Sequence, residues 1–235
     1  LIFSPRAVVG FGGYASVPAV YAAARIGIPT MIHEQNAVLG RANRFLAPRA
    51  QRIATSFDAV AHIAPADRAK VHRTGNPVRP EIAALAGHAY AAPVVDGPCH
   101  LLVTGGSQGA SIFGRIVPPA IALLTPALRA RLRIVQQCRS EDLERVETTY
   151  RALGVNAVLR SFFDDMPVRL AWTHLALCRA GASTVAELST VGVPAILVPY
   201  PHATDDHQTA NAKALDAAGG VWILPERSFT PERLA

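Results

Sequence analysis

The segment Leu101-Leu102-Val103-Thr104-Gly105-Gly106-Ser107-Gln108-Gly109-Ala110 decides the fold class. Its first four residues form an apolar run of strand length, and its glycines mark a tight turn. A helical segment follows, which we expect Pro118-Pro119 to break or end, because proline removes a backbone donor and clashes with the preceding turn. A strand that passes through a glycine-rich turn into a helix is typical of parallel α/β sheets.

The same order of apolar run, turn and helix repeats on both sides of this segment. Because the runs are apolar throughout instead of alternating, they predict strands that are buried on both faces of parallel sheets. The predicted strands are Val8–Phe11, Thr30–His33, Ile53–Thr55, Leu101–Thr104, Arg133–Gln137, Val155–Leu159, Leu175–Cys178, Ala195–Pro199 and Val221–Leu224. The other predicted helices lie near Pro18–Ile26 and at Glu141–Leu153, Thr184–Val191 and His207–Ala217.

A change in composition suggests two domains. Gly75-Asn76-Pro77-Val78-Arg79-Pro80 is rich in turn formers, and a variable stretch follows it up to Gly97-Pro98. We therefore expect one α/β domain over residues 1–79 and a second over residues 80–235. The first piece is shorter than the ~100–150 residues of a complete domain of this kind. Since the chain also starts without Met, we expect it to be a fragment that lacks an N-terminal segment and the C-terminal end of a longer protein.

The bulk composition excludes several classes of protein. The chain has 235 residues, of which 50% are hydrophobic, and a net charge of +6. No apolar run reaches the ~18–20 residues of a membrane span. We expect no signal peptide, because no charged start leads into an apolar stretch and a small-residue cleavage site. The three cysteines have no zinc-like spacing, which favours free thiols in a reducing cytoplasm. The positive charge is spread along the chain and aromatic residues are few, which argues against nucleic-acid binding.

Ligands of open parallel sheets bind beyond the carboxyl ends of the strands, so the loops after the strands are candidate sites. In Gly105–Ala110, glycines let the backbone approach a ligand, and the N–H groups of a helix start favour an anion. No GK[ST] sequence follows, so the loop is not a Walker motif. The alternative is a tight turn that needs glycine only for its backbone angles.

The loop from Arg179 to Glu187 also joins a strand to a helix. A diphosphate would fit on this helix start with Ser183 and Thr184 as donors, and the Glu187 carboxylate could accept two hydrogen bonds from a ribose diol. The alternative is that Thr184 and Glu187 form a capping box, which needs no ligand. The spacing alone leaves both interpretations open.

Two further polar loops are candidates. His33-Glu34-Gln35-Asn36 follows a strand and could hydrogen-bond a sugar, although an ordinary solvated loop would look the same. The segment Pro201–Gln208 leads into a helix on which Gln208 and Asn211 share a face. The alternative is a polar first turn with Asp205 or Asp206 as its cap. The spacing of its His and Asp residues matches no common ligand pattern, so we predict no metal site.

Seven segments, taken in order, resemble the MurG family of bacterial transferases, which add N-acetylglucosamine to lipid I to give lipid II. They cover nearly the whole chain. The matching segments are Gly10–Tyr14, His33–Asn36, Gly75–Arg79, Gly105–Ala110, Phe163–Met166, Cys178–Glu187 and Val198–Ala212.

The resemblance implies a GT-B architecture, in which two Rossmann-like domains flank a cleft, and a site that needs no cofactor. UDP-N-acetylglucosamine would lie mainly on the second domain. Phe163 would offer backbone groups to the uracil, Glu187 would bind the ribose, and Gln208 would contact the sugar hydroxyls. His207 stands where the family often has Gln, which puts a side-chain contact there in doubt. The other implied donor-binding residues are Asn36, Arg79, Ser107, Ala182, Ser183, Thr184, Val185 and Ala186.

The resemblance also implies an inverting hexosyltransferase. The C4 hydroxyl of the muramyl sugar in undecaprenyl-pyrophosphoryl-MurNAc-pentapeptide (lipid I) would attack the anomeric carbon, and UDP would leave. The family's usual candidate for the general base is a histidine in an upstream glycine-rich loop, which this chain lacks. His33 and Glu34 are the catalytic candidates within the chain. We therefore expect the chain to bind UDP more readily than it transfers sugar.

The implied setting is peptidoglycan synthesis, and with it cell shape, cell division and the cell cycle. The enzyme would be a peripheral protein on the cytoplasmic face of the bacterial inner membrane. Its partners would be lipid I, an anionic membrane surface and other cell-wall synthesis proteins. No nucleic acid is expected.

Other functions remain open from the sequence. A related lipid glucosyl- or galactosyltransferase, or a UDP-N-acetylglucosamine 2-epimerase, would share the fold, and a panel of UDP-sugars would separate them. A nucleotide-binding subunit without catalysis would tolerate substitution of Glu187 or Arg79. A nucleic-acid binder is suggested only by the positive charge, and salt-sensitive DNA binding without UDP binding would support it.

Overall fold

The computed structural model describes residues 3–106 and 109–235, and it contains two parallel β-sheets. In the first sheet the strands follow one another in sequence, in the order β1-β2-β3-β4, and every neighbouring pair is parallel. The strands are β1 (Val8–Gly10), β2 (Thr30–Glu34), β3 (Arg52–Thr55) and β4 (Val71–Arg73).

The second sheet has the strand order β10-β9-β8-β5-β6-β7, again with parallel pairs only. The chain therefore builds it outward from β5 in one direction and from β8 in the other. The strands are β5 (Cys99–Thr104), β6 (Leu132–Gln137), β7 (Asn156–Arg160), β8 (Leu175–Cys178), β9 (Ala195–Leu197) and β10 (Val221–Ile223).

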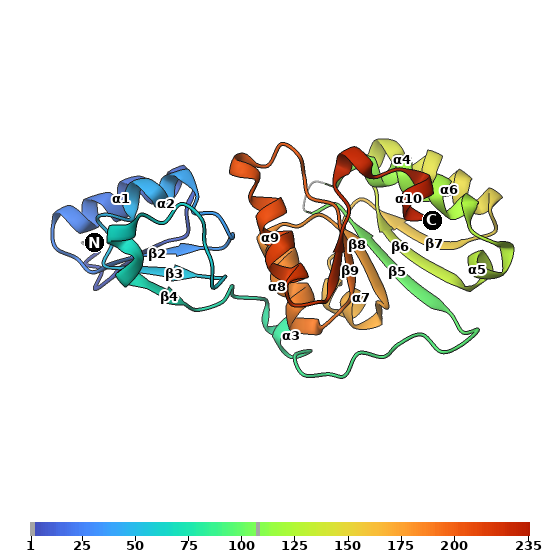
Figure 1. Cartoon of the computed structure of the whole chain (residues 1–235), viewed down its shortest axis with the longest axis horizontal. Helices are drawn as coiled ribbons and strands as arrows, with labels where there is room; N and C mark the ends of the chain where they lie inside the picture. Colours follow the sequence, from blue (N-terminus) through green and yellow to red (C-terminus); the bar gives the residue numbers. More distant parts are fainter. Residues whose placement is uncertain (1–2, 107–108) are drawn as a thin grey trace.

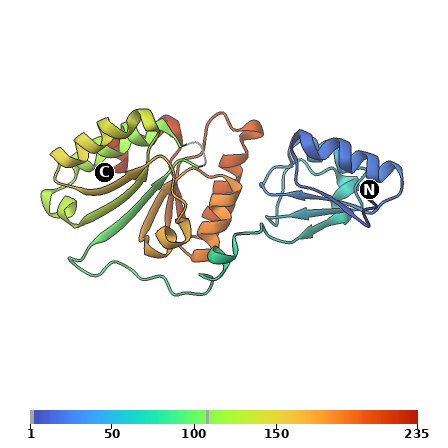
Figure 2. The same cartoon turned by 180° about the vertical axis from the view of Figure 1, so that it is seen from behind.

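Helices cover both sheets. Along the first sheet lie α1 and α2, and α8 and α9 stand on the side of the second sheet that faces the first (Figures 1 and 2). The helices, with η for 3-10 turns, are α1 (Gly13–Arg25), α2 (Arg41–Leu46), η1 (Pro65–Lys70), α3 (Pro80–Ala83), α4 (Ser111–Leu123), α5 (Pro126–Arg131), η2 (Ser140–Asp142), α6 (Leu143–Ala152), α7 (Met166–Trp172), α8 (Ala182–Val191), η3 (Thr204–Asp206), α9 (His207–Asp216), η4 (Glu226–Ser228) and α10 (Pro231–Leu234).

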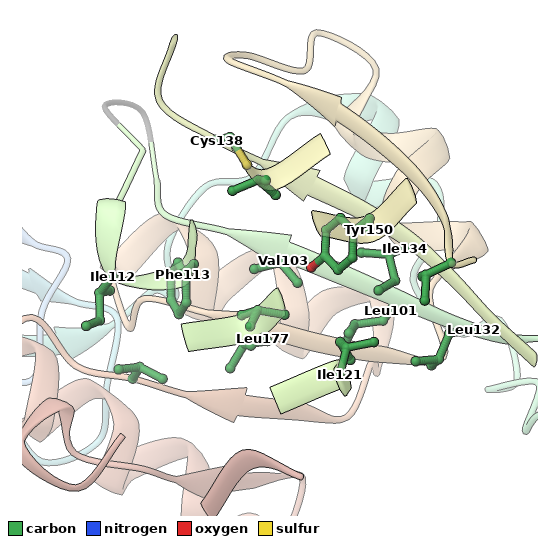
Figure 3. Close-up of a cluster of buried hydrophobic side chains, with 14 of the residues drawn as sticks. Leu101, Val103, Ile112, Phe113, Ile121, Leu132, Ile134, Cys138, Tyr150 and Leu177 are labelled. Carbon is green, nitrogen blue, oxygen red and sulfur yellow. The ribbon is translucent and has the colours of Figure 1, made fainter. Parts of the chain in front are cut away.

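The second sheet is buried on both faces, as its apolar strands predicted. On one face Val103 of β5 packs with Phe113 of α4 and Tyr150 of α6 (Figure 3). On the other face the adjacent Leu102 packs with Leu188 of α8. At the edge, β7 is only half-buried and alternates between exposed and partly covered positions. Burial on both faces forces the strand residues to be apolar without alternation.

Each predicted strand is present, with ends that differ by no more than two residues. Strand β4 was not predicted, because Val71-His72-Arg73 is short and largely polar and pairs only along one edge with β3. The first helix begins at Gly13, five residues before the predicted start at Pro18. Gly12 has a φ of 82°, a backbone conformation that glycine adopts at low cost and that lets the chain turn directly from β1 into α1.

The prediction that Pro118-Pro119 would break the helix after β5 was wrong. Helix α4 continues through both prolines to Leu123. Pro118 cannot donate to the carbonyl of Gly114, but the Arg145 guanidinium of α6 donates to that carbonyl at 3.0 Å instead. Pro118 is also buried in the helix face that packs on the sheet. Tertiary contacts therefore offset the lost backbone hydrogen bond.

The connection between the sheets runs from Gly75 into α3. Ile82 of α3 is fully buried in the core of the second sheet, beside Leu102 and Val185. This packing puts α3 in the same core as the second sheet.

Candidate functional site

The candidate site lies between the neighbouring strands β5 and β8. From β5 the chain adds strands toward one edge of the second sheet, and from β8 it adds them toward the other edge. Thr104 and Cys178 are register partners at the carboxyl ends of these neighbouring strands. The loops that start at Gly105 and Arg179 consequently leave the sheet side by side. In doubly wound sheets such a switch point is the preferred position for a ligand, because the two loops diverge and open a crevice.

A cavity of about 270 Å³, here called the inner cavity, opens at this point. Phe163, in the loop after β7, forms part of its wall and is buried, with the Arg169 guanidinium 5.4 Å from its ring centroid. The other lining residues are Arg79, Leu102, Thr104, Gly106, Gln137, Phe162, Met166, Leu170, Ala176, Cys178, Thr184, Glu187 and Leu188. The mainly apolar wall with a few polar groups is suited to a flat, partly polar ring.

Two of the predicted site residues form an ion pair on the wall of the inner cavity. Arg79 Nη2, from the connection, lies 3.2 Å from Glu187 Oε1 of α8. The capping-box alternative for Glu187 is wrong, because α8 begins at Ala182 with Gly181 as its N-cap and with no side-chain cap. Glu187 therefore lies in the second turn of the helix and faces the cavity.

A larger cavity of about 870 Å³, the cleft cavity, adjoins the inner cavity through Gly106 and Thr184. Residues from both sheets line it, including Asn36, Gln208 and the start of α8. The first hydrogen bond of α8 runs from Val185 N to Gly181 O at 2.9 Å. The N–H groups of residues 182–184 precede that bond and point out of the helix start, where an anion is stabilised.

The predicted donor residues do not all present side chains to these cavities. Val185 is buried in the core, and Ala186 lines another cavity, about 570 Å³ in volume, which shares Gln35 and Ala182 with the cleft cavity. Ala182, Ser183 and Thr184 line the cleft cavity. Ser107 lies outside the described residues.

Gln208, in the first turn of α9, fixes the loop after β8. Its Oε1 accepts hydrogen bonds from Ala180 N at 3.2 Å and from Tyr200 N at 3.0 Å. Because the oxygen is occupied by backbone donors, the amide –NH₂ group is the part of this side chain that can face a ligand in the cleft cavity.

The His33–Asn36 segment is held by its own side chains. His33 Nε2 lies 3.0 Å from the carbonyl oxygen of Gly75, and its Nδ1 lies 3.0 Å from Gln35 Nε2. The buried Glu34 carboxylate accepts from Asn36 N, Asn36 Nδ2, Gly40 N and Asn43 Nδ2 at 2.8–3.1 Å. These contacts fix the His33 and Glu34 side chains in place.

Two residues near the site lie in segments singled out from the sequence, but no role was predicted for either. Arg179 is buried at the end of β8, where it donates to the carbonyls of Val198 and Pro199 and pairs with Glu226 at 2.6 Å. Asn211 of α9 contacts the His33–Asn36 segment of the other sheet. Only the three-residue spacing between Gln208 and Asn211 pointed to the second of these.

The turn before α9 connects the two sheets. Asp205 forms ion pairs with Arg44 and, at 3.9 Å, with Arg41 of α2. Of the two caps offered by the alternative interpretation, Asp206 occupies the N-cap position of α9, but its side chain makes no capping hydrogen bond. His207 Nδ1 lies 2.8 Å from Thr204 O, so this ring stabilises the turn.

The cysteines near the site are unsuited to nucleophilic chemistry. Cys178 lines the inner cavity, and burial raises its thiol pKa to about 12. Burial and the nearby Asp142 carboxylate raise the pKa of Cys138 to about 11. A thiol with such a pKa holds little reactive thiolate at neutral pH. Over residues 3–106 and 109–235, no group of three or more His, Cys, Asp or Glu residues is arranged to hold a metal ion.

Known proteins resemble this chain over almost its whole length. The profile of the glycosyltransferase family 28 C-terminal domain matches residues 100–235, and that of the family 28 N-terminal domain matches residues 2–55. The chain is 62% identical over 231 residues to a UDP-N-acetylglucosamine--N-acetylmuramyl-(pentapeptide) pyrophosphoryl-undecaprenol N-acetylglucosamine transferase of Rhodospirillum centenum, covering 98% of this chain and 61% of the relative. It is 59% identical to the enzyme of the same name from Paramagnetospirillum magneticum, covering 98% of this chain and 62% of the relative.

Among solved structures, MurG of Acinetobacter baumannii superposes with a TM-score of 0.77 at 36% identity, covering 97% of this chain and 63% of that one. The GT-B fold predicted from the sequence is thereby confirmed. The chain spans about three fifths of the length of the relatives it matches.

Proposed function

The chain belongs to glycosyltransferase family 28, and from that premise we propose that it is the donor-binding part, with a portion of the acceptor part, of a lipid I N-acetylglucosaminyltransferase. The full enzyme would move N-acetylglucosamine from UDP-N-acetylglucosamine to the C4 hydroxyl of the muramyl sugar of undecaprenyl-linked lipid I, with inversion, and so give lipid II. The names of the relatives from Rhodospirillum centenum and Paramagnetospirillum magneticum support this substrate pair.

The observation that carries the proposal is the convergence of groups suited to a UDP-sugar around two adjoining cavities. In the proposed pose the uracil occupies the inner cavity beside Phe163, and Glu187 accepts hydrogen bonds from the ribose. The diphosphate lies at the start of α8, and the sugar lies in the cleft cavity between Gln208 and Asn36. A pyrimidine nucleoside, a diphosphate and a hexose then follow one another in the order of the donor molecule.

The proposed mechanism depends on the start of α8. As the C4 hydroxyl attacks the anomeric carbon, negative charge grows on the departing diphosphate. The N–H groups of Ala182, Ser183 and Thr184 point to that position and stabilise the charge without reorganising. His33 and Glu34, which precede Asn36 by three and two residues, are the candidates in this chain for receiving the hydroxyl proton.

A fourth cavity supports an acceptor position beside the donor. It measures about 660 Å³, and it shares Phe11, Gln35 and Asn36 with the cleft cavity. Its walls include the exposed aromatic side chains of Tyr14 and Phe45. We place the muramyl sugar of lipid I here, because the acceptor hydroxyl must reach the anomeric carbon near Asn36.

An aromatic patch next to this cavity is our candidate for the membrane contact. It consists of Phe11, Tyr14, Tyr21 and Phe45, of which Tyr14 is 97% exposed. Tyr21 and Phe45 stack at 5.9 Å, with the Arg49 guanidinium 4.7 Å from the Phe45 ring centroid. Aromatic rings with adjacent arginines suit an anionic lipid surface. None of the described helices is long and apolar enough to cross a bilayer.

The proposed setting is accordingly the cytoplasmic face of the inner membrane, in peptidoglycan synthesis, and through it in cell shape and division. Other cell-wall synthesis proteins are proposed as partners.

Calorimetry tests the donor proposal directly. We expect the chain to bind UDP, and to bind UDP-N-acetylglucosamine in preference to UDP-glucose and UDP-galactose. Absence of UDP binding by a folded sample would contradict the proposed function. Preference for another UDP-sugar would favour a related lipid glycosyltransferase.

A further inference from the structure

Asn211 makes hydrogen bonds to both parts of the chain. Its side chain is fully buried on α9, 0% exposed. Its Oδ1 accepts from Ala37 N at 2.8 Å, its Nδ2 donates to Asn36 Oδ1 at 3.0 Å, and the same nitrogen donates to Ala180 O at 3.1 Å. One carboxamide thus joins the segment after β2 in the first sheet to the loop after β8 in the second.

These partners fix the orientation of the Asn211 amide. A backbone N–H can only donate and a backbone carbonyl can only accept, so Oδ1 must face Ala37 and Nδ2 must face Ala180. Since Nδ2 also meets the side chain of Asn36, the atom of Asn36 that it meets must be the oxygen. Asn211 therefore determines which way the Asn36 amide points.

The orientation of the Asn36 amide determines which hydrogen bonds its nitrogen can make. With its oxygen held by Asn211, its nitrogen donates one hydrogen to Glu34 Oε1 at 3.1 Å. A primary amide carries two N–H hydrogens, so one is left for another acceptor. Asn36 lines the cleft cavity, where the proposed function puts the hydroxyls of the donor sugar. Glu34 and Asn211 together thus orient the Asn36 amide so that its second N–H can donate to the sugar.

Asn211 acts on the opposite wall of the cavity as well. Together with Gln208, one turn earlier on α9, it holds both backbone polar groups of Ala180, because Gln208 Oε1 accepts from Ala180 N at 3.2 Å. Ala180 immediately precedes the turn that starts α8. The same helix therefore sets the loop at the diphosphate position and the asparagine at the sugar position.

We propose that Asn211 is a positioning residue for the sugar of the donor: it aims the Asn36 amide across the two halves of the cleft and sets the distance between Asn36 and the loop at Ala180. The proposal rests on the proposed function, and it predicts an effect that is specific to the sugar. The uracil and ribose are assigned to the inner cavity, whose walls do not include Asn36 or Asn211.

The test compares the affinities for UDP and for UDP-N-acetylglucosamine, measured by calorimetry on this chain. In the wild type, the ratio of the dissociation constant of UDP to that of UDP-N-acetylglucosamine measures how much the sugar contributes to binding. We expect Asn36→Ala and Asn211→Ala each to reduce that ratio about tenfold, which corresponds to about 1.4 kcal/mol. In the double variant we expect no further loss, because a residue that acts through another shows non-additive effects.

Two variants make the comparison specific. Asn211→Ala leaves the buried N–H of Ala37 without an acceptor, so Asn211→Asp is measured beside it; this change keeps an oxygen for Ala37 and replaces the amide that donates to Asn36. Lys213→Ala, on the exposed side of the same helix, is the matched control and should leave the ratio unchanged. The side-chain amide signals of Asn36 in a ¹⁵N correlation spectrum should move in both Asn211 variants and stay in place in the control.

Each outcome decides a different point. The proposal is supported if folded Asn211 variants show a reduced affinity ratio and the double variant shows no further reduction. An unchanged ratio, or losses that add in the double variant, overturns it while leaving the proposed function intact. A wild-type chain that does not bind UDP overturns both.

Discussion

Arg79 Nη2 lies 3.2 Å from Glu187 Oε1, so two residues proposed to bind the same nucleotide form an ion pair with each other. Arg79 comes from the connection between the sheets, and Glu187 comes from the second turn of α8. A ribose diol that binds the Glu187 carboxylate must share it with the Arg79 guanidinium. The pair therefore ties the position of the connection to the nucleotide site.

The first prediction concerns the Glu187 carboxylate. Glu187→Ala should weaken UDP binding by about tenfold or more, because hydrogen bonds to a charged group contribute about 1.5–3 kcal/mol. The stability of the fold should change by less than about 1 kcal/mol, since the Arg79 partner is 47% exposed. Calorimetry and urea denaturation give the two quantities. Glu147→Ala, which removes an exposed ion pair with Arg151 on α6, is the control and should alter neither. Unchanged UDP affinity in Glu187→Ala would remove Glu187 from the site.

The second prediction concerns the buried pair of Tyr150 and Gln136. Tyr150 Oη donates to Gln136 Oε1 at 2.6 Å inside the core of the second sheet. Tyr150→Phe leaves this oxygen without its donor and should lower the free energy of unfolding by about 1–3 kcal/mol. Urea denaturation at pH 7 measures the loss, and Tyr14→Phe at an exposed position is the control.

The same pair gives a prediction for alkaline pH. Burial raises the pKa of the Tyr150 hydroxyl far above its ordinary value of 10.0. The unfolded chain releases this proton near pH 10 while the folded chain keeps it, so the contribution is complete below about pH 10 and is lost as the pH rises further. The stability of the wild type should therefore fall more steeply between pH 10 and 11 than that of Tyr150→Phe. Equal slopes would show that the hydroxyl does not titrate with unfolding.

The third prediction concerns thiol reactivity. Cys138 and Cys178 are buried with raised pKa values of about 11 and about 12, whereas Cys99 is partly exposed. In native protein at pH 8, iodoacetamide should therefore label Cys99 first, and the other two only when the chain unfolds. Mass spectrometry of timed samples measures this order. A Cys99→Ser variant should show almost no rapid labelling, and fast labelling of Cys178 in the native protein would contradict its burial.

The strands were predictable because parallel sheets covered on both faces need apolar residues, and Leu101–Thr104 carries that requirement in its composition. The path of α4 was not predictable, because the partner that replaces the backbone donor lost at Pro118 is Arg145, on another helix. Local sequence predicts a strand or helix well where burial determines its residue types. It predicts less well where a contact with a distant residue determines how far the element extends.

The same contrast holds in the site. The loops at Gly105 and Gly181 could be proposed as ligand loops from the sequence, because glycines and hydroxyls between a strand and a helix suit an anion by their chemistry alone. The capping-box alternative at Thr184 and Glu187 could not be excluded from spacing, since it depends on where α8 begins. Asn211 was named only for the helix face it shares with Gln208; its contact with Asn36 could not be predicted, because Asn36 lies 175 residues away along the chain.

The fourth prediction concerns the aromatic patch of Phe11, Tyr14, Tyr21 and Phe45. Replacing the exposed Tyr14 and Phe45 by serine should reduce cosedimentation with vesicles of anionic phospholipid severalfold, because two aromatic side chains that enter the interface are lost. Higher salt should weaken the binding that remains, since the neighbouring arginines act through charge. Ile26→Ser, an exposed apolar position at the end of α1, tests whether the effect is specific to the patch. Equal binding by all variants would exclude the patch as the membrane contact.

The last prediction concerns Asp205, which joins the turn before α9 to Arg44 and Arg41 of α2. Asp205 has a φ of 53°, a left-handed conformation that Asp and Asn tolerate better than other side chains. Asp205→Asn therefore removes the charge and keeps the backbone, whereas Asp205→Ala also strains the backbone by about 1–2 kcal/mol. We expect Asp205→Asn to cost less than about 1 kcal/mol at low salt and nothing near 1 M salt, where charges are screened within about 3 Å. The larger loss in Asp205→Ala should persist at high salt.

Thermal unfolding across a salt series measures both effects on Asp205. Asp58→Asn, which removes an exposed ion pair with Arg73 inside the first half of the chain, is the matched control. If the Asp205 pair holds the two halves together, Asp205→Asn should also weaken binding of UDP-N-acetylglucosamine, which spans both halves in the proposed pose, more than it weakens binding of UDP. Asp58→Asn should change neither affinity. If Asp205→Asn instead lowers the thermal stability equally at all salt concentrations, the turn contributes through its backbone conformation and not through its charge. Uncharged contacts, such as that of Asn211 with Asn36, would then hold the two halves in position.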